Sequence, residues 1–218
     1  MTQPGTSSGN GSASILALVV SNALTLVFAL WLDWPLGMLL WPYWLQSLVI
    51  GWYAGRRMLA LQSFSTEGFR MGNQRVSEDA RGKRMTVAFF ACHYGFFHFV
   101  YFFFLTGMAA LSDPTDLLTV LACGLAYTLA QRQTFRQQVA ADARGRPNLG
   151  VLMFLPYLRI VPIHLTIILG AATGELISLF VFIPLKTVAD IALDRLDRRM
   201  AEKTILDWLM KQERQREP

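Results

Sequence analysis

The sequence predicts an all-α, polytopic membrane protein with about six transmembrane helices and both termini in the cytoplasm. Only 16% of its 218 residues are charged, whereas soluble domains carry about 25%. Long stretches have no Asp, Glu, Lys or Arg, namely residues 1–32, 34–55 and 85–112. Each is long enough to supply the roughly 20 apolar residues that cross a bilayer as a helix.

The expected elements alternate between apolar spans and polar connections. Residues 1–12 are rich in Gly and Ser and predict a disordered tail. The six expected spans, which form a transmembrane domain over residues 13–193, are 13–32, 34–55, 85–111, 117–131, 148–170 and 175–193. In the second span, Trp34 and Trp52 lie near the two ends, where aromatic belts occur.

The connections have their own signals. The loop 56–84 is long, polar and basic, and its first residues can continue the preceding helix. Asp113 precedes Pro114 and is expected to cap the start of the next helix. The loop 132–147 contains four arginines. Residues 194–218 form a basic tail, which is either a helix on the membrane surface or a solvated extension of the last span.

The basic residues indicate the orientation. The loop 56–84 holds seven Lys or Arg residues, the loop 132–147 holds four, and the tail after residue 193 holds seven of the twenty. The intervening turns hold only acids. The positive-inside rule then places the basic segments in the cytoplasm, next to anionic lipid headgroups. The net charge of +5 is thereby explained without nucleic acid. We expect a multi-pass protein of the bacterial inner membrane, with a homo-oligomer left open.

Polar residues inside the spans are the candidate functional residues, because such residues are costly in a membrane and usually face the bundle interior. The candidate ligand-binding residues are Asn22, Gln46, His93, Tyr94, His98, Tyr101, Tyr157, Arg159, His164, Lys186 and Asp190. Helical rise places several of them in one layer, about 13–20 Å from the cytoplasmic ends of their spans.

Helical phase groups these residues further. Tyr94, His98 and Tyr101 are spaced i, i+4, i+7 and share one face of their helix. Tyr157 and His164 share a face of the fifth span. Pro162 removes a backbone donor there and frees the carbonyl of Leu158, and such helix breaks form binding sites in transporters.

The charges favour an anionic or lipid ligand, because Arg159 and Lys186 make this layer positive and Asp190 is its only acid. Two alternatives stay open: a metal or haem redox protein using the histidines, and a structural or assembly protein in which the cluster is only packed. No cofactor is indicated by a motif, no metal site is assigned, and no catalytic motif appears, so an enzyme is the less favoured reading.

Four motifs resemble a family of bacterial membrane proteins, the domain-of-unknown-function family six-four-nine-eight. They are YWLQSLVIG at 43–51, HYGxF at 93–97, PYxRIVxxHxTIIxG at 156–170 and LKTxxD at 185–190. The resemblance implies a multi-span membrane fold and no activity. Members often carry Glu-Asn at Gln46-Ser47, a second His at Tyr101, and a His a few residues after Asp190, so those functions are altered here if the family site needs them.

Overall fold

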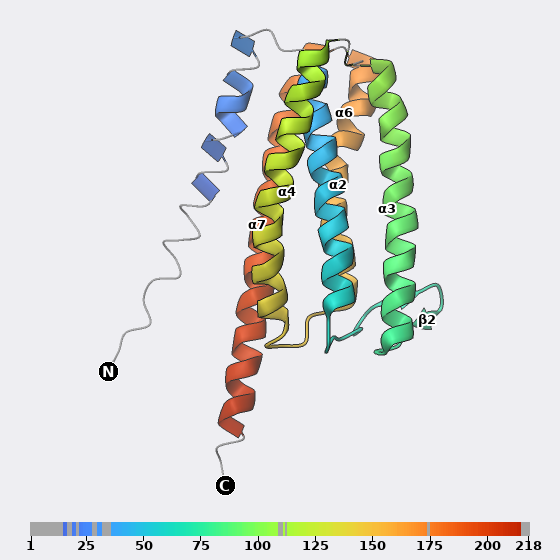
Figure 1. Cartoon of the computed structure of the whole chain (residues 1–218), viewed down its shortest axis with the longest axis vertical. Helices are drawn as coiled ribbons and strands as arrows, with labels where there is room; N and C mark the ends of the chain where they lie inside the picture. Colours follow the sequence, from blue (N-terminus) through green and yellow to red (C-terminus); the bar gives the residue numbers. More distant parts are fainter. Residues whose placement is uncertain are drawn as a thin grey trace, which may run out of the picture.

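The computed structural model is a bundle of long helices that run side by side (Figure 1). It describes residues 15–16, 19–20, 22–27, 30–31, 36–108, 111, 113–173 and 175–214. The residues described between 15 and 31 are helical, in agreement with the first expected span. The tail expected over residues 1–12 lies outside the described residues.

The described helices follow the expected order but not all of the expected lengths. Their bounds are α2 Leu36–Ala60, α3 Ala80–Met108, α4 Pro114–Asp142, α5 Leu149–Phe154, the 3₁₀ segment η1 Leu155–Arg159, α6 Ile160–Thr173 and α7 Glu175–Arg214. Within the bundle α2 is central, and it contacts α3, α4, α5, η1, α6 and α7.

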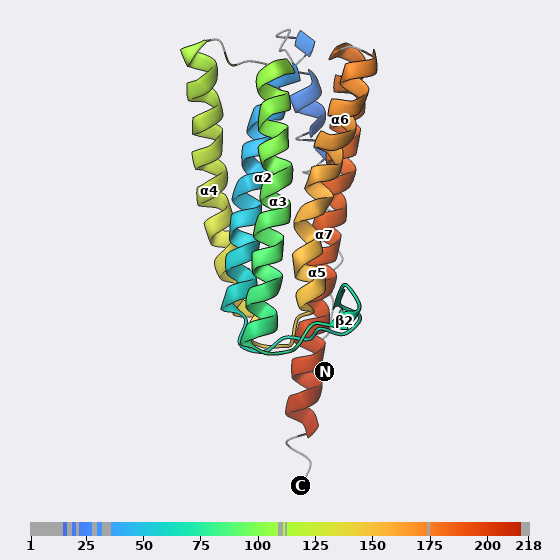
Figure 2. The same cartoon turned by 90° about the vertical axis from the view of Figure 1, so that its right-hand side faces the viewer.

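The largest differences from expectation are in α4 and α7. The loop expected over 132–147 is helical as far as Asp142, because its Gln, Arg and Ala residues are good helix formers. The helix begins as expected, with the Asp113 carboxylate accepting a hydrogen bond of 2.8 Å from the Thr115 amide. The tail after residue 193 continues α7 without interruption to Arg214 and projects beyond the bundle (Figure 2).

A folded loop closes the end of the bundle where α7 projects. It contains the antiparallel strands β1 (Arg70–Met71) and β2 (Gln74–Arg75). Ser65 pairs with the segment before α5, donating to the Pro147 carbonyl at 3.0 Å and accepting from the Leu149 amide at 2.9 Å. The surface segment expected over most of 56–84 is therefore an ordered cap on the bundle.

Glu78 connects the start of the cap, at Thr66, with Arg146 in the segment before α5. Its carboxylate accepts a hydrogen bond of 2.8 Å from the Thr66 amide and pairs with Arg146. The Thr66 hydroxyl is buried and donates to the Val76 carbonyl at 2.7 Å. The amide of Thr66 stabilises the charged carboxylate and lowers the pKa of Glu78 below its usual value. Glu78 is therefore ionised at neutral pH and holds the cap together.

The outer surface of the bundle carries many large apolar side chains. Phe96 and Phe99 on α3 are both 62% exposed, and Leu118 and Leu125 on α4 are 66% and 62% exposed. Val188 on α7 is 65% exposed. Contiguous apolar surface of this kind marks contact with a membrane or another protein.

Two described segments, Ala80–Gly107 and Leu149–Leu169, are long and apolar enough to cross a membrane. They correspond to the third and fifth expected spans. Among the described helices, α2, α4 and α7 do not meet the same criterion. In α7 the charges of Lys186 and Asp190 interrupt the apolar run. The helical class is confirmed, while a six-span topology goes further than this finding.

Candidate functional site

An interrupted helix positions the central arginine of the candidate site. The expected fifth span is one helical path made of α5, η1 and α6, and Pro156 stands at the start of η1. Arg159 is the last residue of this 3₁₀ turn, and the Ile160 amide donates to the Tyr157 carbonyl. The expected break near Pro162 therefore lies just before Arg159 and takes the form of a tightened turn, which occurs at helix junctions and hinges.

Three charged side chains meet where η1 packs against α7. Arg159 Nη1 lies 3.0 Å from Asp190 Oδ1, and Lys186 Nζ lies 2.7 Å from Asp190 Oδ2. The Asp190 side chain is only 6% exposed, and those of Arg159 and Lys186 are 15% and 19% exposed. Two cations thus share one carboxylate in a largely buried position.

The two ion pairs differ in quality. Lys186 donates a well-formed hydrogen bond to Asp190 and another of 2.8 Å to Asn22 Oδ1, and it lies 5.5 Å from the centroid of the Tyr43 ring. The Arg159 Nη1 and Asp190 Oδ1 atoms are close enough for an ion pair, but their orientation does not make a hydrogen bond. Arg159 is therefore held by charge at this nitrogen and not by directional bonding.

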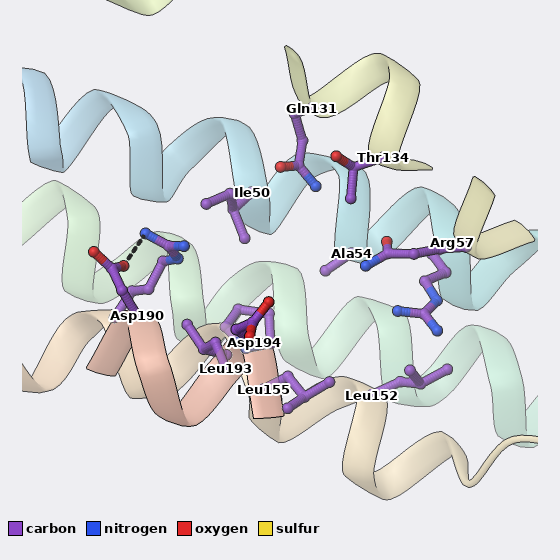
Figure 3. Close-up of a pocket in the computed structure, with 13 residues that line it drawn as sticks. Ile50, Ala54, Arg57, Gln131, Thr134, Leu152, Leu155, Asp190, Leu193 and Asp194 are labelled. Atoms are coloured by element: carbon purple, nitrogen blue, oxygen red, sulfur yellow. Dashed lines mark ion pairs between the residues drawn. The ribbon is translucent and has the colours of Figure 1, made fainter. Parts of the chain in front are cut away.

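A cavity of about 300 Å³ leads to this cluster (Figure 3). Its wall comes from α2, α4, α5, η1 and α7, and Arg159 and Asp190 lie at one end of it. The polar groups along it include Gln131, Thr134 and Arg57. In Figure 3 the dashed line marks the ion pair of Asp190 with Arg159, and the side chains of Gln131 and Thr134 extend from α4. The volume is at the lower end of the range for ligand pockets.

A second buried ion pair lies toward the capped end of the cavity. Arg57 Nε and Nη2 bind the two Asp142 oxygens at 2.7 and 2.9 Å. The side chains are 10% and 8% exposed. This bidentate pair joins the last turns of α2 and α4. The pair holds the end of α4 beside α2 and so stabilises the helix as far as Asp142.

His93 and His98 lie on α3, which packs against α2, and His164 lies on α6. His98 is 2% exposed, packs against Trp44, Tyr94 and Tyr101, and binds the Tyr94 carbonyl through Nδ1 at 2.9 Å. Tyr94 also bonds Ser47 at 2.7 Å. The shared face predicted for Tyr94, His98 and Tyr101 is confirmed, because all three are buried.

Two reciprocal His–Tyr pairs connect α3 with the interrupted helix. His93 Nδ1 lies 2.9 Å from the Tyr157 hydroxyl, and the Tyr101 hydroxyl lies 3.1 Å from His164 Nδ1. His93 and His164 are exposed on the outer side of this seam. Among the described residues no group of three His, Cys, Asp or Glu side chains is arranged to hold a metal ion.

The sequence-predicted residues therefore separate into two groups. Asn22, Arg159, Lys186 and Asp190 form one cluster, of which Arg159 and Asp190 line the cavity. The aromatic and histidine residues form a separate layer, whose members are His93, Tyr94, His98, Tyr101, Tyr157 and His164. Gln46 is half-buried on α2, and none of the described contacts joins it to either group. The expectation of a single polar layer holds only for the first group.

Sequence reasoning missed Tyr43, Arg57 and Asp142. Tyr43 is 2% exposed and its hydroxyl, near Arg159, has no described partner of standard hydrogen-bond geometry. Asp142 was assigned to a loop, and Arg57 to the start of a loop whose first residues could continue the preceding helix. The available signal was the run of helix formers after Gln131, which carries α4 about three turns past its uncharged stretch, to Asp142.

Residues 5–206 match a protein family described as a family of unknown function, DUF6498. The chain belongs to this family. The match includes every motif on which the resemblance was based and every candidate site residue. No curated protein and no solved structure matches the chain. The function of this DUF6498 protein must therefore be argued from its own geometry.

Proposed function

We propose that this DUF6498 protein is an integral membrane protein that binds a small anion, a carboxylate or a phosphate group, at Arg159. The observation that carries the proposal is that two buried cations share one carboxylate at the end of a cavity. The anion belongs either to a soluble metabolite or to a lipid headgroup. Transport of the same anion across the membrane is the wider form of the proposal.

The outer surface supports the membrane location. Exposed Phe and Leu side chains on α3 and α4 would be unfavourable in water at roughly 25 cal/mol per Å² of apolar surface, and lipid tails remove this cost. The polar cap, the end of α4 and the projecting part of α7 lie together at one end of the bundle (Figures 1 and 2). Eighteen of the twenty Lys and Arg residues fall in the sequence segments 56–84, 132–147 and 194–218.

The charge balance at Arg159 supports an anion as the ligand. Arg159, Lys186 and Asp190 together carry one excess positive charge. A buried charge without a counter-ion is costly. A unit anion about 4 Å from the guanidinium gains roughly 4 kcal/mol at an effective dielectric constant of 20. The planar guanidinium of arginine can also donate two parallel hydrogen bonds to a carboxylate or a phosphate group.

Replacing Arg159 with glutamine is expected to weaken anion binding roughly ten- to hundredfold, which is the loss of one charged hydrogen bond. The fold should persist, because Asp190 keeps its bond to Lys186. Isothermal titration of the purified protein with inorganic phosphate, acetate and a short-chain phosphatidic acid measures the effect and separates free anions from lipid.

Two variants serve as controls for this experiment. Arg159→Lys retains the charge without the planar fork and should bind with intermediate affinity. Arg136→Gln removes an exposed arginine elsewhere on α4 and should bind all three probes like the parent. Equal binding by the parent and Arg159→Gln, with unchanged stability, would exclude Arg159 as the anion site.

The proposed topology has both termini, the loop 56–84 and the end of α4 in the cytoplasm. Single cysteines test it in a background lacking the two native ones, Cys92 and Cys123. In intact cells a membrane-impermeant thiol reagent should label Thr115→Cys, at the acidic end of the bundle. It should label Ser63→Cys only after the membrane is opened. The reverse pattern, or equal labelling, would contradict the proposed orientation.

A further inference from the structure

A second cavity, of about 400 Å³, lies at the basic end of the bundle. It is formed where the cap rests on α5, η1 and α7, and Arg159 is not among the residues that line it. Most of its wall is apolar, formed by Phe69, Gly150, Val151, Phe154, Leu158 and Leu196, and the charged residue in the wall is Glu67, on the cap.

Close packing fixes the shape of this groove. A Cβ atom at Gly150 would lie 2.7 Å from Cγ of Phe69, so only glycine lets the cap approach α5 so closely. The cap is held there by the bond from Arg146 Nε to the Phe64 carbonyl at 3.0 Å and by that from Asn148 Nδ2 to the Glu67 carbonyl at 2.9 Å. The groove is therefore preformed, which favours binding because less order must be gained.

Exposed apolar side chains line the groove, and a basic residue follows one of them on α7. Phe154 is 59% exposed, Val151 41% and Leu196 38%. Arg199 is exposed and follows Leu196 by three residues on α7, so the two are neighbours on one helix face. An occupant that satisfies both surfaces has an apolar chain and a negative group at its end.

We infer that this groove binds an anionic phospholipid, with an acyl chain against Val151, Phe154 and Leu158 and the phosphate beside Arg199. The position suits such a molecule, because α5 begins at Leu149 where the fifth expected span meets the cytoplasmic boundary. Headgroups and acyl chains meet at that depth. The inference rests on the proposed membrane location and is independent of the Arg159 site.

Native mass spectrometry of the full-length protein in detergent tests the inference with two probes, dioleoylphosphatidylglycerol and dioleoylphosphatidylcholine. The parent protein should retain more phosphatidylglycerol than phosphatidylcholine. Arg199→Gln should reduce that preference about fivefold, as expected for one basic residue near an anionic headgroup. Val151→Trp should fill the groove and lower the occupancy of both lipids, and Val151 is exposed enough to accept the larger ring without disturbing the core.

Matched variants separate specific from general effects. Arg136→Gln and Leu121→Trp alter an exposed arginine and an exposed leucine on α4, and both should bind lipid like the parent. Equal losses in Arg199→Gln and Arg136→Gln, or full occupancy in Val151→Trp, would overturn the inference. Arg159→Gln should keep the lipid, so failure of the anion site and failure of the groove give different results.

Discussion

Asp190→Asn is expected to lower the free energy of unfolding by about 3–5 kcal/mol, the usual cost of removing one partner from a buried ion pair. The asparagine removes the charge that Arg159 and Lys186 share, and both cations then remain largely buried. Thermal unfolding of the detergent-solubilised protein, followed by circular dichroism, measures the loss. The effect should exceed that of any other single carboxylate on α7.

Asp194→Asn provides the matched control on the same helix. Asp194 lies one turn further along α7 and pairs with Arg198 at 2.9 Å, but these side chains are 22% and 39% exposed. Exposed i, i+4 pairs contribute about 0.3–0.5 kcal/mol. A comparable loss in the two variants would show that burial does not distinguish the Asp190 cluster, and would remove the main support for an unbalanced charge at the cavity.

Gly51→Val is expected to destabilise the bundle by about 1–3 kcal/mol through overpacking. A Cβ atom at Gly51 would lie 2.9 Å from Cδ1 of Tyr94, and this ring cannot move freely because its hydroxyl bonds Ser47 at 2.7 Å. The substitution should therefore separate α2 from α3. The loss should appear in the same unfolding measurement, together with greater hydrogen exchange in both helices.

Gly55 lies one turn away on the same helix and gives the opposite expectation. Nothing lies within 4 Å of a Cβ atom built there, so Gly55→Ala should gain up to about 1 kcal/mol of helix propensity. Destabilisation by both substitutions would indicate that the two glycines act together in helix packing. The predicted difference means that, of these two glycines, only Gly51 is required for close packing between helices.

Residue spacing within one helix predicted the structure well. Lys186 and Asp190 are four residues apart, a spacing that makes side chains neighbours on a helix, and they form an ion pair. The i, i+4, i+7 spacing correctly placed Tyr94, His98 and Tyr101 on a buried face. These results follow from helical geometry alone, which fixes the neighbours along each helix once its existence is known.

Relations between helices could not be predicted in the same way. Depth estimates put the histidines and Arg159 in one layer, but depth does not determine the direction in which each helix face points. The seam between α3 and the interrupted helix pairs His93 with Tyr157 and Tyr101 with His164, while Arg159 faces α7. The ion pair between Arg57 and Asp142 was not predicted, because residues 132–147 were expected to form a loop and spacing along one helix does not reveal a partner on another.

The length of α7 has a mechanical consequence. Asp190 and Arg214 belong to one unbroken helix, and 24 residues of helix span about 36 Å. A regular helix is stiff over this distance. Any rotation or shift of the helix at Asp190 is therefore carried to its far end, well outside the bundle. Lys186 and Asp190 are thus mechanically coupled to the projecting segment, whereas Arg159 belongs to a different element.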